Sequence, residues 1–120
     1  MTDHHAVPSE ITAWRVVRHG RPSEALELER VPTPRPGPGE VLIRTATTVC
    51  NYNEVDGCHG RYRTIDPPLP YTLCMELVGE VVDAGSGAEG WLGQRVMATA
   101  TGATGAHAEA AVAPVDMTFP

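Results

Sequence analysis

The chain has 120 residues, of which 42% are hydrophobic and 20% are charged, and its net charge is −6. This length corresponds to one domain, and the composition is that of an ordinary globular protein. The acidic balance argues against nucleic acid or an anionic membrane as the main partner. The sequence also lacks an apolar run of the about 20 residues that a membrane span needs and the pattern of a signal peptide, so we expect a cytoplasmic protein.

The first half of the chain is predicted to form strands separated by proline-rich connections. Residues 1–11 are polar and are expected to form a disordered tail. Residues 13–18 are typical of a strand, and residues 25–31 alternate apolar with charged side chains, the period of a half-buried strand. Residues 32–39 contain four prolines and are therefore expected to be an extended connector. Residues 40–50 are the longest β-rich run.

The second half continues this pattern after one short helix. Asn51 is a good N-cap, and the helix is expected to end near Gly57 or Gly60. A second proline-rich connector covers residues 66–70. Three more β-rich runs follow, at residues 76–84, 94–98 and 106–113. Many short strands joined by Pro and Gly turns predict an all-β barrel or sandwich.

Residues 85–90 read GSGAEG and fit the G-x-G-x-x-G pattern of dinucleotide-binding loops. A working loop of that type must open a helix, whose N-terminus meets the pyrophosphate, and an acidic residue follows about 20 positions later. The segment after Gly90 is short and broken by glycine, and the following region offers no acid before Glu109. We therefore predict a glycine-rich turn between antiparallel strands.

Several stretches, taken together and in order, resemble one family. They are PRPGPGEVLIR (34–44), VCNYNEVDGCHGRY (49–62), PPLPYTLCMELVGEVVDAGSG (67–87), GQRVMA (93–98) and GAHAEAAVAP (105–114). They resemble the GroES-like N-terminal catalytic domain of the medium-chain dehydrogenases/reductases, also called the zinc-type alcohol dehydrogenase-like superfamily. The zinc-free NADPH:quinone oxidoreductase branch looks most similar. The resemblance covers residues 12–120 and implies a mainly β, partly open barrel with one or two short helices. It also implies that a Rossmann domain, which would carry the cofactor fingerprint, is missing from this chain.

The resemblance further implies that the catalytic zinc of the family is absent. Zinc-dependent members carry a Cys after the third strand and a His in a G-H-E motif, whereas this chain has Asn51 and Met75 at those positions. An amide and a thioether are poor substitutes for the Cys, His, Asp or Glu ligands of zinc. The structural zinc lobe is also missing, since no cysteine follows Cys74.

Other possible metal ligands are poorly placed in the sequence. Cys50 is one residue from the family's ligand position, and such a shift redirects a side chain. Cys58 and His59 are adjacent, and neighbours rarely face one metal. His4 and His5 lie in the expected tail. We therefore expect no metal site.

Four residues are expected at the substrate and cofactor cleft through the resemblance. Asn51 matches an Asn near the nicotinamide, although a plain N-cap role is equally consistent. Tyr62 matches a cleft tyrosine of some relatives, with a surface-loop aromatic as the alternative. Met75 is expected to fill the space of the missing zinc ligand, while the role of Tyr52 transfers less directly. Cys74 stands where glycine is common. No catalytic acid or base is identified.

The resemblance implies a fragment of an NADPH-dependent, zinc-independent quinone or enone oxidoreductase that transfers hydride. The fragment is expected to be inactive alone, because the Rossmann domain would bind most of the NADPH. A small-molecule electron acceptor and a homodimeric full-length protein are the implied partners. Two alternatives remain open, a stand-alone GroES-like binding module without catalysis and an alcohol dehydrogenase-like enzyme.

Overall fold

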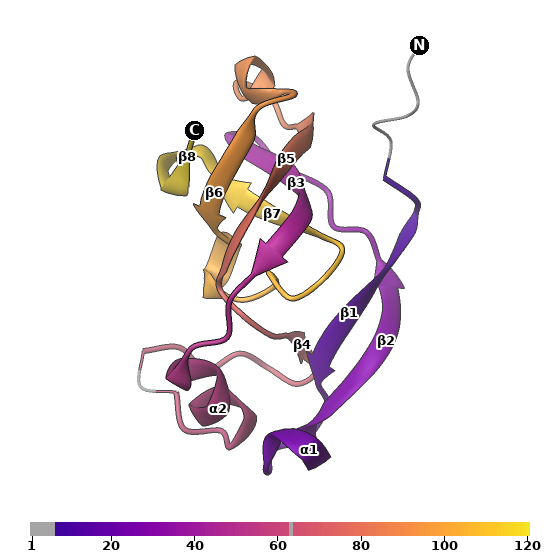
Figure 1. The fold of residues 1–120 in the computed structure, drawn as a ribbon, viewed down its shortest axis with the longest axis vertical. Coiled ribbons are helices and arrows are strands. Elements are labelled where there is room, and N and C mark those ends of the chain that lie inside the picture. Colours follow the sequence, from indigo (N-terminus) through magenta and orange to yellow (C-terminus); the bar gives the residue numbers. More distant parts are fainter. Residues whose placement is uncertain (1–6, 63) are drawn as a thin grey trace.

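A computed structural model describes residues 7–62 and 64–120 of the chain. It contains two antiparallel sheets and two short α-helices (Figure 1). The smaller sheet has the strand order β2-β1-β4. Its strands are β1 (Glu10–Val16), β2 (Leu26–Pro32) and β4 (Tyr71–Thr72). Helix α1 (Pro22–Ala25) joins β1 to β2.

The larger sheet has five strands in the order β7-β3-β5-β6-β8. They are β3 (Glu40–Thr48), β5 (Glu76–Ala84), β6 (Arg95–Thr99), β7 (Ala110–Pro114) and β8 (Thr118–Phe119). Helix α2 (Tyr52–Cys58) leaves the end of β3 and lies below this sheet in Figure 1. A bridge between Ala13 and Ala108 links the two sheets. The result is a curled, partly open barrel, which confirms the predicted fold class.

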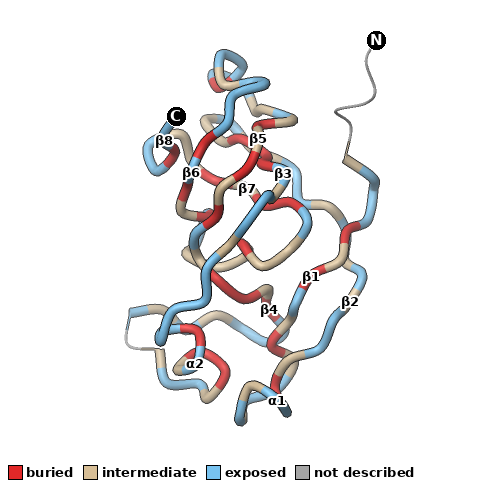
Figure 2. Tube along the Cα trace, in the orientation of Figure 1, coloured by how far each residue is buried: buried red, intermediate tan, exposed pale blue. Residues whose placement is uncertain are grey.

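The first part of strand β3 crosses the core, since Val41, Leu42 and Ile43 are buried on both faces of the sheet. Val41 and Ile43 are fully buried in the larger hydrophobic cluster. Leu42 points the other way and packs with Ile11 and Ala110 in a second cluster. Figure 2 shows this buried part of β3 next to the buried positions of β5, whereas the end of β3 that leads to α2 is exposed. A continuous apolar run such as VLI suits this position, since one-sided strands alternate instead.

Two glycines allow the backbone to approach itself closely. A Cβ at Gly79 would lie 2.0 Å from the carbonyl oxygen of Arg44 on the paired strand. A Cβ at Gly85 would lie 1.8 Å from the carbonyl oxygen of Gly37. No side chain fits at these separations, so both positions require glycine for close packing rather than for chain flexibility.

The GSGAEG segment is the connection between β5 and β6, which pair antiparallel. Its only helical element is the single 3-10 turn Glu89–Trp91. Ala88 N–H donates to the Gly85 carbonyl, closing a tight turn within the segment. The predicted glycine turn is confirmed, and the loop lacks the helix that a pyrophosphate would need.

Several boundaries differ from the sequence predictions. Strand β1 begins at Glu10 and Ile11 is 1% exposed, so the ordered part starts before the expected end of the tail at residue 11. The first six residues of that tail lie outside the described residues. Helix α1 and the two-residue strands β4 and β8 were not predicted, because elements this short carry almost no periodicity. In the part of the chain that is described, no helix has the length and apolarity to cross a membrane.

Candidate functional site

Asn51 sits at the start of α2 and fixes how the chain leaves β3. Its backbone is extended, with φ −100° and ψ 174°, as expected of an N-cap. The Asn51 N–H donates to Oε1 of Glu54 over 2.6 Å, and the Glu54 N–H donates to the Asn51 carbonyl over 3.0 Å. The predicted helix and its cap are therefore confirmed. Glu54 is 2% exposed, and its second carboxylate oxygen has no partner among the described residues.

The side chain of Asn51 is oriented by Glu76 at the start of β5. Its Nδ2 donates to Oε1 of Glu76 over 3.2 Å. Thr48, three residues earlier, donates from Oγ1 to the Glu76 carbonyl over 2.7 Å. These two hydrogen bonds hold the end of β3 against the start of β5. We call the hydrogen-bonded pair of Asn51 and Glu76 the Asn51–Glu76 clamp. Glu76 thus accepts hydrogen bonds from both Thr48 and Asn51.

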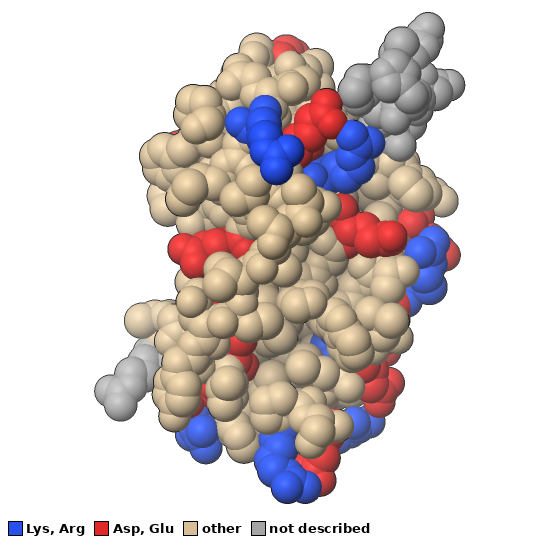
Figure 3. Space-filling view, viewed as in Figure 1, with Lys and Arg blue, Asp and Glu red and all other residues tan. Residues whose placement is uncertain are grey.

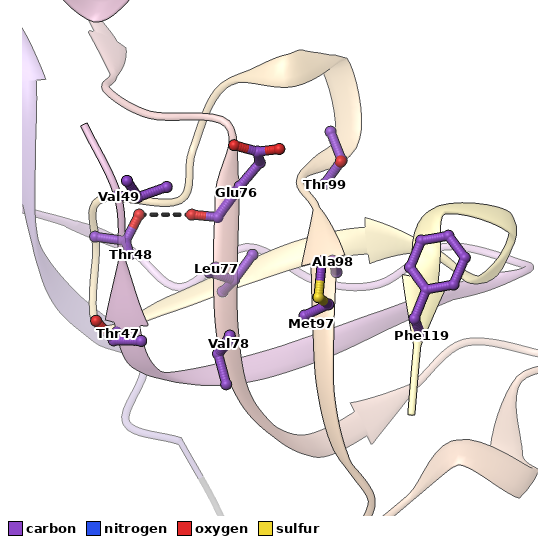
Figure 4. Close-up of a pocket in the computed structure, with 10 residues that line it drawn as sticks. All are labelled: Thr47, Thr48, Val49, Glu76, Leu77, Val78, Met97, Ala98, Thr99 and Phe119. Atoms are coloured by element: carbon purple, nitrogen blue, oxygen red, sulfur yellow. Dashed lines mark hydrogen bonds between the residues drawn. The ribbon is translucent and has the colours of Figure 1, made fainter. Parts of the chain in front are cut away.

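An apolar groove of about 290 Å³ opens beside this clamp (Figure 4). It is lined by residues 47–49, 76–78 and 97–99 and by Phe119, which come from β3, β5, β6 and β8. The side chains of Val49, Met97 and Phe119 are 47%, 58% and 51% exposed. No pattern in the sequence indicates this groove, because its members become neighbours only when the sheet forms. Its volume is near the lower end for small-molecule sites.

The two tyrosines expected at the cleft, Tyr52 and Tyr62, lie outside this groove, and their place at the cleft stays a prediction. Tyr52 is 74% exposed on α2. Tyr62 is half-buried, with its ring centroid 6.5 Å from that of Tyr71. Both rings pack on Gly57, where a Cβ would lie 2.5 Å from Cε2 of Tyr62 and 2.6 Å from the Tyr71 hydroxyl. Neither Tyr52 nor Tyr62 lines the groove.

Burial governs the chemistry of these phenols. It raises the pKa of Tyr62 to about 12, with the nearby charge of Glu54 adding to the effect. Burial also raises the pKa of Tyr71, helped by the neighbouring Tyr62. The hydroxyls of both residues are buried without a partner among the described residues. They are therefore neutral core groups at physiological pH.

Met75 is half-buried between the buried Cys74 and the exposed Glu76. Its carbonyl accepts from the Ala100 N–H over 2.7 Å, and its side chain is not part of the groove wall. Its expected role, filling the place of a zinc ligand, stays a prediction.

Two cysteines and a histidine come together near the Asn51–Glu76 clamp, and no pattern in the sequence indicates this. The Sγ atoms of Cys50 and Cys74 are 3.2 Å apart, and Nδ1 of His107 lies 3.7 Å from the first and 3.3 Å from the second. Cys74 is fully buried, Cys50 is exposed, and His107 is half-buried. We call these three residues the Cys–His cluster. No sequence signal connects them, because long stretches of chain separate each from the next.

Burial shifts the cluster toward its neutral forms. It raises the pKa of the Cys74 thiol, and the hydrogen bond and charge of Cys50 and the charge of Glu54 act in the same direction. Burial also lowers the pKa of His107. The ring is therefore uncharged at neutral pH and can use Nδ1 as an acceptor or a ligand.

The residues at the family's ligand positions do not fit a zinc ion. Asn51 uses its amide to bind Glu76, and Met75 offers only a thioether. The pyrophosphate of a dinucleotide does not fit the GSGAEG segment either, since that loop opens no helix of useful length. Neither group therefore has a place at the positions that the sequence first suggested.

The strand order and the partly open barrel place the chain in the GroES-like class of β-domains. A sequence model of the alcohol dehydrogenase GroES-like domain matches residues 37–120, and the chain belongs to this family. Among curated proteins, L-threonine 3-dehydrogenase of Xanthomonas axonopodis pv. citri is 40% identical over 80 residues, covering 63% of this chain and 23% of that protein. The enzyme of the same name from Pyrococcus abyssi is 37% identical over 76 residues, covering 58% and 20%.

Solved structures resemble the whole barrel. A putative NADPH:quinone reductase from Mesorhizobium loti has a TM-score of 0.77 and 29% identity, covering 100% of this chain and 38% of that one. The human synaptic vesicle membrane protein VAT-1 homolog-like protein has a TM-score of 0.84 and 28% identity, covering 92% and 35%. A mycobacterial protein complexed with NADPH has a TM-score of 0.79 and 30% identity, covering 91% and 32%. The chain thus spans under half the length of these relatives and is a domain of an oxidoreductase family.

The surface carries charges of both signs. In the face shown in Figure 3, acidic and basic side chains are interspersed, and no concentrated basic patch forms.

Proposed function

We propose that this chain is the substrate-side domain of an NADPH-dependent, zinc-independent oxidoreductase that reduces a quinone or an α,β-unsaturated carbonyl. The observation that carries the proposal is the Asn51–Glu76 clamp beside the apolar groove. Asn51 and Met75 stand where a zinc-dependent member would bind its metal. The names of the quinone reductase and of the NADPH-bound relative support the same reaction class.

The groove suits a flat, electron-poor acceptor. Its apolar walls at Val49, Met97 and Phe119 remove water from around the acceptor ring. Asn51 does not line the groove, but its amide is held by Glu76, which does, and a second amide hydrogen remains to orient a carbonyl oxygen. Orientation and exclusion of water are what a protein contributes when the cofactor performs the chemistry.

NADPH, when bound, supplies the hydride. Because the GSGAEG loop does not fit a pyrophosphate, we assign the cofactor to a separate Rossmann-type domain outside these 120 residues. By the same reasoning this chain alone is inactive. The family resemblance further supports a homodimeric, cytoplasmic full-length protein without nucleic-acid or membrane partners.

The first test is direct binding of an acceptor to this chain. A ¹H–¹⁵N correlation spectrum titrated with a water-soluble naphthoquinone should shift the amides of residues 47–51, 76–78 and 97–99 more than the rest. Met97→Ala should weaken binding, whereas Leu92→Ala, an exposed apolar residue outside the groove, should not. Shifts confined to other surfaces would contradict the proposed site.

The second test concerns the cofactor. This chain alone should show no measurable NADPH binding, and a micromolar affinity would contradict the assignment to another domain. A protein that contains this domain together with a dinucleotide-binding domain should oxidise NADPH with a panel of quinones and enones. No oxidation across the panel would refute the proposed reaction.

An alcohol dehydrogenase-like activity is the second candidate. Several curated relatives are named L-threonine 3-dehydrogenase, with identities of 37–41% over the matched segment. The discriminating measurement is NAD⁺ or NADP⁺ reduction by L-threonine in the same two-domain protein. A stand-alone binding module, the third possibility, predicts neither activity.

A further inference from the structure

The Cys–His cluster joins three segments that are far apart in the sequence. Cys50 follows β3, Cys74 lies between β4 and β5, and His107 precedes β7. A site formed by one element can arise by chance from local sequence. The Cys–His cluster forms only when the ends of strands from both sheets come together.

The backbone around two of the three residues is firmly held. The Ala106 N–H donates to the Cys74 carbonyl over 3.0 Å, and the His107 N–H donates to the Leu73 carbonyl over 2.9 Å. The His107 carbonyl in turn accepts from the Trp14 N–H over 3.0 Å. Cys74 and His107 are therefore placed by main-chain bonds, and their side chains do not depend on a flexible loop.

The donor atoms have the spacing of a metal site. A tetrahedral zinc ion, with Zn–S bonds of about 2.3 Å and Zn–N bonds of about 2.0–2.1 Å, separates two sulfurs by about 3.8 Å and sulfur from nitrogen by about 3.6 Å. The observed separations are 3.2 Å between the sulfurs, and 3.7 and 3.3 Å from the sulfurs to Nδ1. Side-chain movements of about half an ångström would bring the three atoms to ligand positions. All three lie within 4.8 Å of one another.

The backbone of Cys74 supplies an independent sign of a special role. Its φ is +70°, in the left-handed region that favours glycine. This backbone conformation is strained for any residue with a Cβ, and cysteine rarely adopts it. Strained residues of this kind concentrate at functional sites, and here the thiol of the strained residue is the one in contact with both other donors.

We propose that Cys50, Cys74 and His107 bind one zinc ion, with a fourth position open to solvent beside the exposed Cys50. The residues differ from those at the family's ligand positions, Asn51 and Met75. The ion would fasten β3, the β4–β5 connection and the segment before β7 to one another. This inference differs from the absence of metal that the sequence predicts, and it does not depend on the proposed function.

The test is metal binding by the reduced chain after removal of metals with a chelator. Zinc should bind with one-to-one stoichiometry in competition with a chromophoric chelator and should raise the melting temperature. Cobalt(II) as a spectroscopic probe should give the near-ultraviolet absorption of thiolate-to-cobalt charge transfer. Cys50→Ser, Cys74→Gly and His107→Gln should each lower zinc affinity by about 100-fold or more, beyond the usual loss for residues that only support a ligand.

The controls separate ligation from folding. Cys74→Gly is expected to fold, because φ of +70° suits glycine. Cys58→Ala and His59→Gln remove a thiol and an imidazole outside the cluster and should leave zinc affinity unchanged. The proposal is overturned if the reduced chain does not bind zinc at equimolar concentration. It is also overturned if Cys50→Ser and Cys74→Gly bind as tightly as the original chain, or if the two cysteines form a stable disulfide under the reducing conditions of the assay.

Discussion

At the scale of single residues, the three cysteines differ because of their surroundings. Cys58 is 1% exposed on the inner side of α2, and burial raises the pKa of its thiol, with the neighbouring Cys50 and Glu54 adding to the effect. Cys74 is fully buried, whereas Cys50 faces solvent. The thiolate is the reactive form, so access and pKa together decide reactivity.

We therefore predict that iodoacetamide modifies Cys50 much faster than the other two cysteines. Peptide mass spectrometry after a short pulse at neutral pH measures the order of modification. Pretreatment with zinc should protect Cys50 if the metal site exists. Equal labelling of all three thiols in the native chain would contradict the burial described for Cys58 and Cys74.

Tyr62 is a second residue whose behaviour follows from its surroundings. Its hydroxyl is buried without a partner among the described residues, although burying a polar group in this way is unfavourable. Removing the hydroxyl should therefore cost nothing, and Tyr62→Phe should unfold in urea at the same or a higher midpoint. Tyr62→Ala, which also removes the ring packed on Gly57, should lose about 3 kcal/mol. A loss of more than about 1 kcal/mol in the Phe variant would reveal a hydrogen bond that this geometry lacks.

At the scale of elements, the β5–β6 connection shows that one glycine motif can occur in two different structural contexts. The three pattern glycines of GSGAEG sit in different environments. Gly85 faces the carbonyl of Gly37, whereas a Cβ at Gly90 would meet nothing within 4 Å. In a phosphate-binding loop the glycines serve the ligand. Here Gly85 allows close packing against the proline-rich connector, and Gly90 lies in the short 3-10 turn.

This difference gives a paired prediction within one loop. Gly85→Ala should lower the free energy of unfolding by about 3 kcal/mol, because the added methyl overlaps a backbone carbonyl that cannot move away easily. Gly90→Ala should change stability by less than about 1 kcal/mol in either direction. Urea unfolding followed by tryptophan fluorescence measures both. Similar effects in the two variants would refute the packing role of Gly85.

At the scale of the whole molecule, several neutral groups near α2 make stability depend on alkaline pH. Burial raises the pKa of Tyr62 to about 12 and also raises the pKa of Tyr71 and of Cys58. In the unfolded chain these groups titrate near about 10 for Tyr and about 8.5 for Cys. The folded state therefore retains protons that the unfolded state releases, and its stability falls as pH rises through this range.

We predict a decline in unfolding free energy that begins above about pH 8.5 and steepens above about pH 10, by up to about 1.4 kcal/mol per pH unit for each phenol. Urea unfolding from neutral pH to about pH 11 measures it. Tyr62→Phe should make the decline shallower, because that variant has one fewer phenol to titrate. A profile that stays flat above pH 10 would contradict the burial of the two phenols.

Much of the fold could be predicted because its cues are local. The strand at residues 76–84 matches β5 at both ends, and the helix cap at Asn51 is where the sequence placed it. Proline cannot donate a backbone hydrogen bond and so interrupts strand pairing, and glycine permits the tight turns between strands. The candidate site was less predictable. Tyr62 packs on Gly57 beside Tyr71, a contact that no local pattern in the sequence indicates, and its expected place at the cleft stays a prediction.

The sequence alone predicts the class of protein, the longer strands and the failure of GSGAEG as a cofactor loop. These predictions follow from hydrophobic periodicity, from the positions of proline and glycine, and from the family resemblance. All of these cues lie in short stretches of the sequence. Contacts between residues that are distant in the sequence depend on the tertiary structure. The groove at Val49, Met97 and Phe119 and the contact of Cys50 with His107 arise from strand order and main-chain bonds between distant segments. A local sequence pattern cannot specify such contacts, because they depend on which strands pair with one another in the sheet.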